Sequence, residues 1–312
     1  MLSAVDSATE PFAVSAPRSA DAGVHTRGAR VRSLGVLTLT CPERPGIVQA
    51  VTSFLLAHGL DIVEHHQFDD SEREVLFLRT AFAAEQPFDL DRLIADFWAT
   101  AEQFDMSFSF HDESQPRLLV MVSKFAHCLN DLIFRWRAGT LAGQIALVVS
   151  NHEDLRQMAE AAGLPFIHVP VTPSTKPEAE ARLLQLVDEY DIDLVVLARY
   201  MQVLSDDLCR QLEGRAINIH HSFLPGFKGA KPYHQAYHRG VKLVGATAHY
   251  VTADLDEGPI IEQEVIRVDH TYHPRTLSTV GQDAECLALS RAVRWHCEHR
   301  ILLHGASTVV FR

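Results

Sequence analysis

The residues best suited to carry out chemistry lie at the end of a short apolar stretch, AINIH, at residues 216–220. Asn218 and His220 are two positions apart, so in a strand both side chains point to the same face. An amide and an imidazole held side by side can donate hydrogen bonds to an oxygen that gains negative charge during a reaction. The stretch therefore predicts an amide donor and an imidazole side by side at the carboxyl end of a strand.

An acidic loop, TADLDEGPI at residues 252–260, lies between two further apolar stretches. Such a loop is ordinarily a solvated turn. It becomes part of a site if Asp256 reaches His220, because a nearby carboxylate favours the charged form of an imidazole. His249 lies near the end of the stretch before this loop, and we expect it either to orient Asp256 or to pack beneath the loop.

The segment that follows His220 is dense in proline and glycine: residues 221–240 read HSFLPGFKGAKPYHQAYHRG. We expect its turns to fix its shape and to pack it across the strand end. His221 is expected to shape the pocket. His234 and His238 are four residues apart and so share one helix face, for which solvent exposure is the favoured interpretation.

Other kinds of catalytic centre lack their motifs. The chain has 18 histidines, but none of the usual metal-ligand spacings such as HExxH is present, so no metal is predicted. Ser222 lies on no GxSxG elbow, and Cys128, beside His127, has no oxyanion framework in the sequence. Neither a GxGxxG motif nor a Walker loop occurs, so we predict no cofactor.

Apolar stretches alternate with helical patterns from residue 117 onward. The expected strands are residues 117–123, 144–150, 165–171, 191–198 and 216–220, with helices at 127–137, from 153, at 178–190 and 205–215, and from about 276 to 300. This alternation predicts a parallel sheet with helices on both faces, and such sheets bind ligands at the carboxyl ends of their strands. Residues 116–312 are therefore expected to form a mostly parallel, Rossmann-like domain.

Residues 33–112 show a different order of elements: strand, helix, two strands, helix and strand, which is the order of a ferredoxin-like α+β domain. In the first turn, CPERPGIV, Pro45 suits the first helical position, and Gly46 lets a ligand or a second backbone approach closely. Through LTLTCPERPGIVQAVTSFLLAHGLDI and REVLFLRTAF, this segment resembles the ACT domain, a small amino-acid-sensing module.

The resemblance to the ACT domain implies regulation and pairing. It places a small amino-acid effector, such as glycine or methionine, against Arg44, Pro45, Gly46 and Ile47, between paired copies of the domain. Pairing of this kind also predicts a homo-oligomer. The alternative is a dimerisation domain that binds no ligand, because a fold alone does not establish a function.

A second resemblance covers the C-terminal part of the chain. INIHHSFLPGFKG with ATAHYVTADLDEGPII resembles the folate-dependent formyltransferase domain shared by glycinamide ribonucleotide formyltransferases and formyltetrahydrofolate deformylases. The paired histidines, the continuation GAKPYHQAYHRGVKLVGATAHYV and the preceding ACT-like segment resemble the deformylases closely. By this resemblance, Asn218, His220 and Asp256 are the catalytic trio.

The same resemblance implies where the substrate binds. ARYMQVLS at residues 198–205 matches the family's pterin-binding segment, in which Met201, Gln202 and Leu204 would supply apolar walls and backbone hydrogen bonds. His249 and Asp254 are also expected to contact the substrate. Without the resemblance, Met201 and Leu204 would be interpreted as ordinary core residues after a strand.

The implied reaction is hydrolysis of 10-formyltetrahydrofolate to formate and tetrahydrofolate, with water as the second reactant. Asn218 and His220 would stabilise the oxyanion. Asp256 would either accept the proton of the attacking water or keep His220 protonated, and the sequence leaves both roles open. The formate would be available for purine biosynthesis.

Hydrolysis competes with two alternatives: formyl transfer to a small amine, and a non-catalytic regulator that senses folate or an amino acid. Transferases that use glycinamide ribonucleotide carry a glycine-rich phosphate loop after their first strand, whereas the equivalent stretch here is VSKFAHCLNDLIFRW. The missing phosphate nest favours hydrolysis. Lys124, His127 and Asn130 would line the vacated side or simply be polar residues at the start of a helix.

Composition limits the other functions. A chain of 312 residues has room for two domains, and its net charge of −12 argues against a nucleic-acid partner. No apolar run is long enough to span a membrane. Five scattered cysteines suit free thiols in a reducing compartment, and residues 1–32 lack the apolar core of a secretory signal. We therefore expect a disordered N-terminal extension on a cytoplasmic protein.

Overall fold

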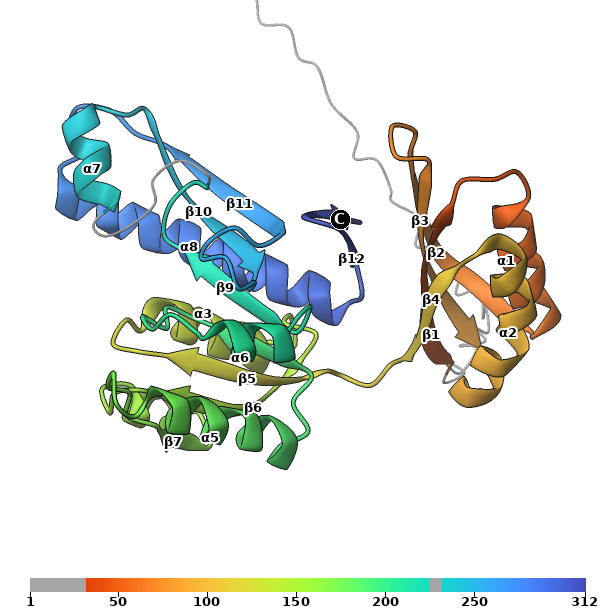
Figure 1. The fold of residues 1–312 in the computed structure, drawn as a ribbon, viewed down its shortest axis with the longest axis horizontal. Coiled ribbons are helices and arrows are strands. Elements are labelled where there is room, and N and C mark those ends of the chain that lie inside the picture. The colour runs from red at the N-terminus through yellow and green to blue at the C-terminus, as the bar shows by residue number, and fades with distance from the viewer. Residues whose placement is uncertain (1–31, 225–231) are drawn as a thin grey trace, which may run out of the picture. The chain divides into compact units, whose positions relative to one another are not determined.

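The structure is a computed structural model, and it describes residues 32–224 and 232–312 (Figure 1). Almost all of the expected N-terminal extension lies outside the described residues. So does the part of the proline- and glycine-rich loop at residues 225–231. Among the helices that are described, none has both the length and the apolar character needed to cross a bilayer.

The N-terminal domain is a four-stranded antiparallel sheet with two helices. Its elements are β1 (Ser33–Pro42), α1 (Ile47–Ala57), β2 (Leu60–Asp70), β3 (Val75–Ala84), α2 (Leu90–Phe104) and β4 (Ser107–Asp112). The strand order is β2-β3-β1-β4, and Figure 1 shows both helices next to the sheet. The expected ferredoxin-like α+β fold is confirmed.

Periodicity explains these elements. Leu37, Leu39 and Cys41 alternate along β1 and are buried, as a strand with one covered face requires. The helix α1 buries the stripe that contains Ile47 and Val51 against the same core. The sequence pattern thus determines which face of each element contacts the other.

The C-terminal domain is built on a seven-stranded sheet with the order β11-β10-β9-β8-β5-β6-β7. Its strands are β5 (Arg117–Val122), β6 (Gln144–Ser150), β7 (Phe166–His168), β8 (Leu194–Leu197), β9 (Ala216–His220), β10 (Leu243–Tyr250) and β11 (Ile260–Arg267). The strands from β5 to β9 are parallel to one another, whereas β10 is antiparallel to both β9 and β11. The expected mostly parallel sheet is confirmed.

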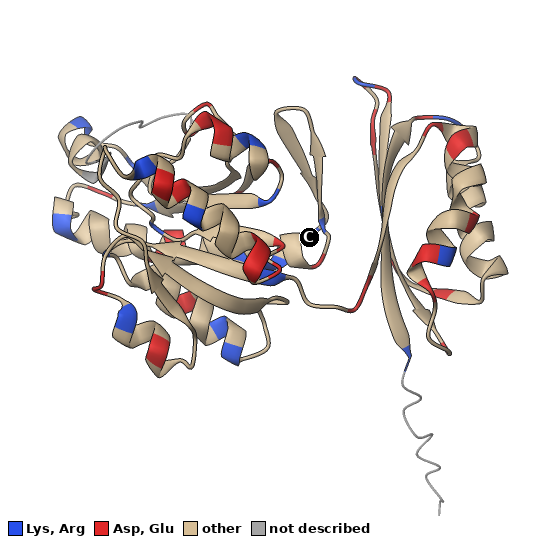
Figure 2. Ribbon diagram, turned by 60° about the horizontal axis from the view of Figure 1, so that its bottom comes forward, with Lys and Arg blue, Asp and Glu red and all other residues tan. Residues whose placement is uncertain are grey.

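Helices cover both faces of this sheet. They are α3 (His127–Arg137), α4 (Arg156–Ala161), α5 (Lys176–Glu189), α6 (Asp206–Gln211), α7 (Pro232–Arg239) and α8 (Pro274–Cys297). One apolar cluster joins α3, α4 and α8 to the sheet, and a second joins α5 and α6 to its other face. Figure 2 shows charged residues mainly on helices and loops, which agrees with a sheet buried on both faces.

A short hairpin follows α8 and was not predicted. It consists of β12 (Ile301–His304) and β13 (Ser307–Val310), and Gly305 turns the chain between them with a φ of 58°. Glycine adopts this left-handed conformation without the steric cost that a side chain would add.

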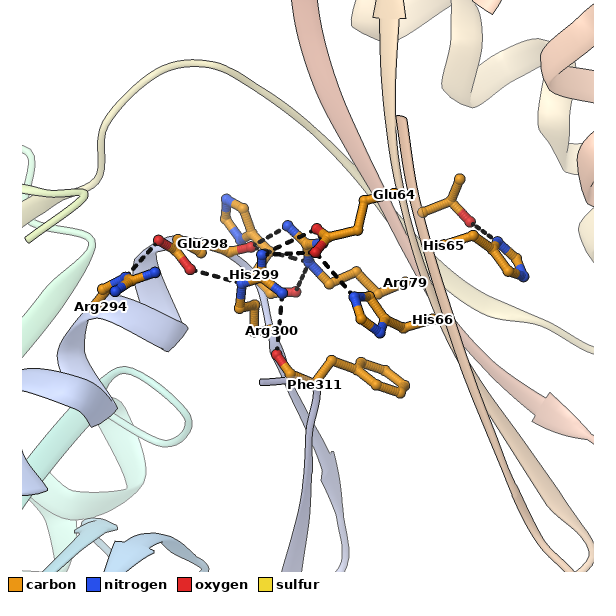
Figure 3. A network of polar contacts seen from close by, with 10 residues as sticks. Glu64, His65, His66, Arg79, Arg294, Glu298, His299, Arg300 and Phe311 are labelled. Carbon is orange, nitrogen blue, oxygen red and sulfur yellow. Dashed lines mark hydrogen bonds and ion pairs between the residues drawn. The ribbon is translucent and has the colours of Figure 1, made fainter. Parts of the chain in front are cut away.

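A polar network joins β2 and β3 to the residues that follow α8 (Figure 3). The buried guanidinium of Arg79 donates to the carbonyl oxygens of Glu298 and His299 and to the Glu64 carboxylate. Arg300 donates to the same carboxylate. Burial raises the pKa of Glu64, but hydrogen bonds from His66, Arg79 and Arg300 outweigh it and lower this pKa to about 2. Glu64 is therefore ionised near neutral pH.

Candidate active site

Strand β9 positions the predicted oxyanion pair. Ile217 and Ile219 belong to the apolar cluster on the α8 face of the sheet, so Asn218 and His220 share the opposite face. Asn218 lies beside Leu197 of β8 in the parallel register and beside His249 of β10 in the antiparallel one. The predicted side-by-side placement is therefore present, at the carboxyl end of a parallel strand.

The loop between β10 and β11 brings Asp256 to this strand end. One carboxylate oxygen of Asp256 lies 3.2 Å from His220 Nδ1, and the other lies 3.7 Å from His249 Nε2. His249 Nε2 also lies 3.2 Å from the Asn218 amide nitrogen. The condition that turns the acidic loop into part of a site is thus met. Asp256 has a left-handed backbone, with a φ of 58°.

The neighbouring imidazoles keep Asp256 ionised. The hydrogen bond from His220, and then the nearby ring of His249, hold the pKa of the Asp256 carboxyl well below its usual range, although burial opposes them. A carboxylate only accepts hydrogen bonds, so Nδ1 of His220 is the donor to Asp256. The Nδ1 atom of His249 lies 2.9 Å from the carbonyl oxygen of Tyr250 and donates to it for the same reason. Both imidazole rings are thereby held in a defined orientation.

Ser222 is a partner of His220 that the sequence analysis did not predict. Its hydroxyl oxygen lies 2.8 Å from His220 Nε2, so Asp256, His220 and Ser222 form a hydrogen-bonded chain. Ser222 is buried and is not among the residues that line the neighbouring cavity. Its placement suits orientation of the imidazole rather than attack on a substrate.

A cavity of about 430 Å³ opens beside the trio. Its described lining residues include Arg199, Tyr200, Met201, Gln202, Val203, Leu204, Asn218, His220, His221, His249, Leu255 and Asp256. Most of this wall comes from the segment after β8 and from the acidic loop. A cavity of this size with an apolar wall and a few convergent polar groups is typical of a small-molecule site.

The cavity tests where each predicted substrate-binding residue lies. Met201, Gln202, Leu204 and His249 all line it. Met201 is 51% exposed, which excludes the interpretation of that residue as core, whereas Leu204 is buried and also belongs to an apolar cluster. Asp254 is exposed and is not among the lining residues. The structure therefore brings four of these five residues together.

The residues expected to bind an effector lie at the start of α1. Gly46 precedes the helix with a φ of 98°, a conformation that favours glycine. Arg44 forms an ion pair with Asp105, and Pro45 is exposed. The side chain of Ile47 is buried in the core, so only its backbone can face a ligand.

His127 contacts a buried carboxylate rather than standing free at a helix start. Its Nε2 atom lies 2.7 Å from a carboxylate oxygen of Glu285, a residue of α8 that is 1% exposed. His127, Cys128 and Glu285 place their donor atoms within 4.8 Å of one another, as some metal sites do. However, Nε of Arg199 lies 3.3 Å from the same Glu285 oxygen. The guanidinium already supplies a positive charge there, so the arrangement fits an ion pair better than a metal site.

Lys124 and Asn130 are the other two residues expected either on the side of a missing phosphate loop or as polar residues at a helix start. Both are exposed, and Asn130 lines a different surface groove together with His127. Sequence reasoning did not identify Arg199 or Glu285. Of these two residues, only Arg199 could have been found from the sequence, because it is a positively charged residue within the segment 198–205 that was assigned to the pterin.

Comparison with known proteins agrees with this geometry. Residues 116–293 match the family model described as formyl transferase. The chain is 57% identical over 279 residues to a formyltetrahydrofolate deformylase of Corynebacterium sp. (strain P-1), covering 89% of this chain and 98% of the relative. It is 40% identical over 275 residues to the enzyme of that name from Escherichia coli (strain K12), covering 88% and 97%.

Solved structures show the same relationship. The formyltetrahydrofolate deformylase of Burkholderia mallei is 52% identical, with a TM-score of 0.85 over 90% of this chain and 100% of that one. A glycinamide ribonucleotide transformylase from Symbiobacterium toebii is 30% identical, with a TM-score of 0.60 over 64% of this chain and 95% of that one. The first match includes both sheets, and the second is limited to about the length of the C-terminal domain. The chain therefore belongs to the formyltetrahydrofolate deformylase family.

Proposed function

We propose that this chain hydrolyses 10-formyltetrahydrofolate to formate and tetrahydrofolate, with Asn218, His220 and Asp256 as its catalytic residues. The observation that carries the proposal is the contact between Asp256 and His220 at the wall of a cavity of about 430 Å³. The names of the relatives, which match over nearly the whole of their own lengths, support the substrate.

The geometry suits attack by water on the formyl carbon. The formyl oxygen becomes negative as the new carbon–oxygen bond forms, and the Asn218 amide can donate a hydrogen bond to it. In its doubly protonated form, with Nδ1 donating to Asp256, His220 can also donate through Nε2, the atom that contacts Ser222 here. Breakdown of the intermediate breaks the bond to N10 of the folate, which leaves protonated as tetrahydrofolate, and the carbon leaves as formate.

Asp256 supplies the acid–base step. Because it is ionised near neutral pH, it can accept the proton of the attacking water or stabilise a positively charged His220. Hydrolysis changes no oxidation state, and the proton that Asp256 accepts from water can be passed to N10 as the carbon–nitrogen bond breaks. Water is the second reactant, and Asn218, His220 and Asp256 supply the hydrogen bonds and the proton transfer.

The remaining assignments follow from the two folds. We assign residues 116–312 to catalysis, with the pterin ring against Met201, Gln202 and Leu204, and residues 33–112 to regulation by a small amino acid such as glycine or methionine. The left-handed Gly46 at the start of α1 supports an approach of a ligand or a second copy at that point. A homo-oligomer paired through this domain follows. The free cysteines of the described residues suit a cytoplasmic location, where the formate would be available for purine synthesis.

One experiment tests the proposed reaction. The full chain is incubated with 10-formyltetrahydrofolate and no amine, and tetrahydrofolate and formate are measured together over time. Hydrolysis predicts that both products appear in equal amounts. Product formation only after an amine is added would show a transferase, and folate binding without any turnover would show a regulator.

A further inference from the structure

Arg199 is a buried arginine in a strained backbone conformation at the carboxyl end of β8. It is 7% exposed, and its φ is 66°, in the left-handed region that favours glycine. Residues with side chains hold this conformation where the surrounding structure imposes it, and such positions cluster at functional sites. Asp256 of the catalytic trio has the same kind of backbone in the same cavity.

The guanidinium of Arg199 has unused hydrogen-bonding capacity. Its Cζ atom lies 5.0 Å from the centroid of the Phe125 ring, and Nε is 3.3 Å from Glu285 Oε2 without the geometry of a hydrogen bond. Across residues 32–224 and 232–312, Nε and Nη1 are buried and have no hydrogen-bond acceptor. Buried donors without acceptors are costly and therefore rare in native proteins. Arg199 is therefore a buried cation whose hydrogen-bonding capacity is not met by the described protein groups.

Glu285 does not satisfy all the donors of Arg199, because its carboxylate also contacts His127. The carboxylate oxygen that faces Arg199 is also the one that lies 2.7 Å from His127 Nε2. A guanidinium presents its donors as a planar fork that matches a carboxylate. A second carboxylate is therefore the ligand that best completes the coordination of Arg199.

The position of Arg199 identifies the source of that carboxylate. Arg199 and His221 line the cavity that also contains Asn218, His220 and Asp256. Among the described residues of that lining, Arg199 is the only arginine or lysine. Burial, and then the charge of Arg199, lower the pKa of His221 to about 4. The neutral ring of His221, 5.4 Å from that of His220, can therefore donate or accept a hydrogen bond.

We infer that Arg199 is the binding group for product formate, in a carboxylate subsite beside the catalytic trio. This inference rests on the proposed hydrolysis. The reaction creates a formate anion next to the ionised Asp256, and two neighbouring negative charges repel each other. Transfer of the formate to the guanidinium of Arg199 separates the two carboxylates and frees Asn218 and His220.

Binding of ¹³C-labelled formate to the full chain, followed by NMR line broadening, tests the subsite without turnover. The variant Arg199→Gln should weaken formate binding by about tenfold or more, because it removes the cation. Glu285→Gln should tighten binding several-fold, because it removes the carboxylate that competes for Arg199. Arg182→Gln is the matched control: Arg182 is exposed and pairs with Glu189 on α5, so its loss should leave formate binding unchanged.

Inhibition by added formate provides a second measurement. In the wild type, formate should slow the release of tetrahydrofolate, and Arg199→Gln should reduce this inhibition by a larger factor than it changes the KM for the folate. A purely structural role of Arg199 would change KM, kcat and thermal stability without a selective loss of formate inhibition. Acetate, which is larger by a methyl group, should bind more weakly than formate.

The outcomes separate this inference from the proposed reaction. Formate binding that depends on Arg199 in a chain without hydrolytic activity would support the subsite and refute the reaction. Hydrolysis with formate binding that is absent, or equal in wild type and Arg199→Gln, would support the reaction and overturn the subsite. If Arg199→Gln does not fold, Glu285→Gln decides: tighter formate binding supports the subsite, and unchanged or weaker binding overturns it.

Discussion

The substitution Asp256→Asn removes one charge from the proposed site and changes the backbone little. Asp256 has a φ of 58°, and asparagine tolerates this left-handed conformation about as well as aspartate does. The amide of asparagine can still occupy the space between His220 and His249. It cannot accept a proton from water, and it cannot stabilise a cationic His220 as a carboxylate does. The change therefore isolates the chemical role of the carboxylate.

The expected loss in kcat is about 10² to 10⁴-fold, the usual contribution of a positioned general acid or base. This corresponds to about 2.7 to 5.4 kcal/mol in activation free energy. Binding of a folate analogue should be retained, because the pterin contacts in this scheme come from residues 201–204. The assay is the initial rate of tetrahydrofolate formation at saturating substrate, with analogue binding measured separately.

The substitution Asp256→Asn should also change the free energy of unfolding and its dependence on pH. Asp256 is 13% exposed and contacts two imidazoles, so its ionised form should contribute about 1.5 to 3 kcal/mol to the free energy of unfolding. Its pKa is lowered in the folded state. This contribution is therefore present above the ordinary aspartate value of 3.8 and is lost as the pH falls below it. The difference between wild type and Asp256→Asn should shrink accordingly in urea denaturation.

The control is Asp254→Asn, in the same loop but outside the cavity lining. It makes the identical chemical change and should leave kcat within about twofold, as an exposed substitution does. The role of Asp256 would be refuted if Asp256→Asn kept kcat within tenfold of wild type. A loss of equal size in Asp254→Asn would show that the loop acts through its overall charge.

Three further predictions concern the framework. In Gly258→Ala, the new Cβ atom would lie 1.8 Å from the Tyr250 carbonyl oxygen, so the loop that carries Asp256 must shift. We expect kcat to fall about tenfold or more, because the carboxylate moves away from its position. An unchanged kcat would show that the loop tolerates the shift. Burial lowers the pKa of His299 to about 3, so folding stability should fall as the pH drops from 6.5 towards 3. His299→Asn should reduce that loss by up to about 1.4 kcal/mol per pH unit in urea denaturation at several pH values, and a parallel pH dependence would contradict this. Arg79→Met removes one of the donors to Glu64 and the guanidinium that serves the carbonyl oxygens of Glu298 and His299, and it should lower the free energy of unfolding by about 3 kcal/mol. The control substitution Arg92→Met, at an exposed arginine, should change that free energy by less than about 1 kcal/mol.

The spacing of apolar residues along the sequence predicted most of the fold. The alternation along β1 and the stripe of α1 are local properties, and both elements occur in the expected order at the start of residues 33–112. The expected strand at residues 165–171 is limited to Phe166–His168, because prolines at 165 and 170 cannot donate to a ladder. The hairpin after α8 was missed because two short strands give little periodic signal.

The candidate site was predictable only where sequence spacing or resemblance carried it. Asn218 and His220 are two residues apart on one strand, which a period of two predicts directly. Asp256 was assigned through resemblance, and its contact with His220 depends on how the loop folds back. The pair of Arg199 and Glu285 depends on the packing of α8 against the sheet. Such long-range packing leaves no pattern in a single sequence.

The order of strands in the seven-stranded sheet has a consequence for how the protein reaches its active state. Strand β5 lies between β6 and β8, so the chain forms one edge of the sheet through β6 and β7 before β8 and β9 can pair on the other side. The proposed catalytic residues come from β9 and from the loop before β11, and Glu285 of α8 contacts Arg199 in the wall of the same cavity. Contacts between segments so distant in sequence are slow to form, because the entropy of closing long loops must be lost first. We therefore expect the active centre to be among the last parts of the domain to assemble, and a chain growing on the ribosome can complete it only after the loop before β11 has emerged.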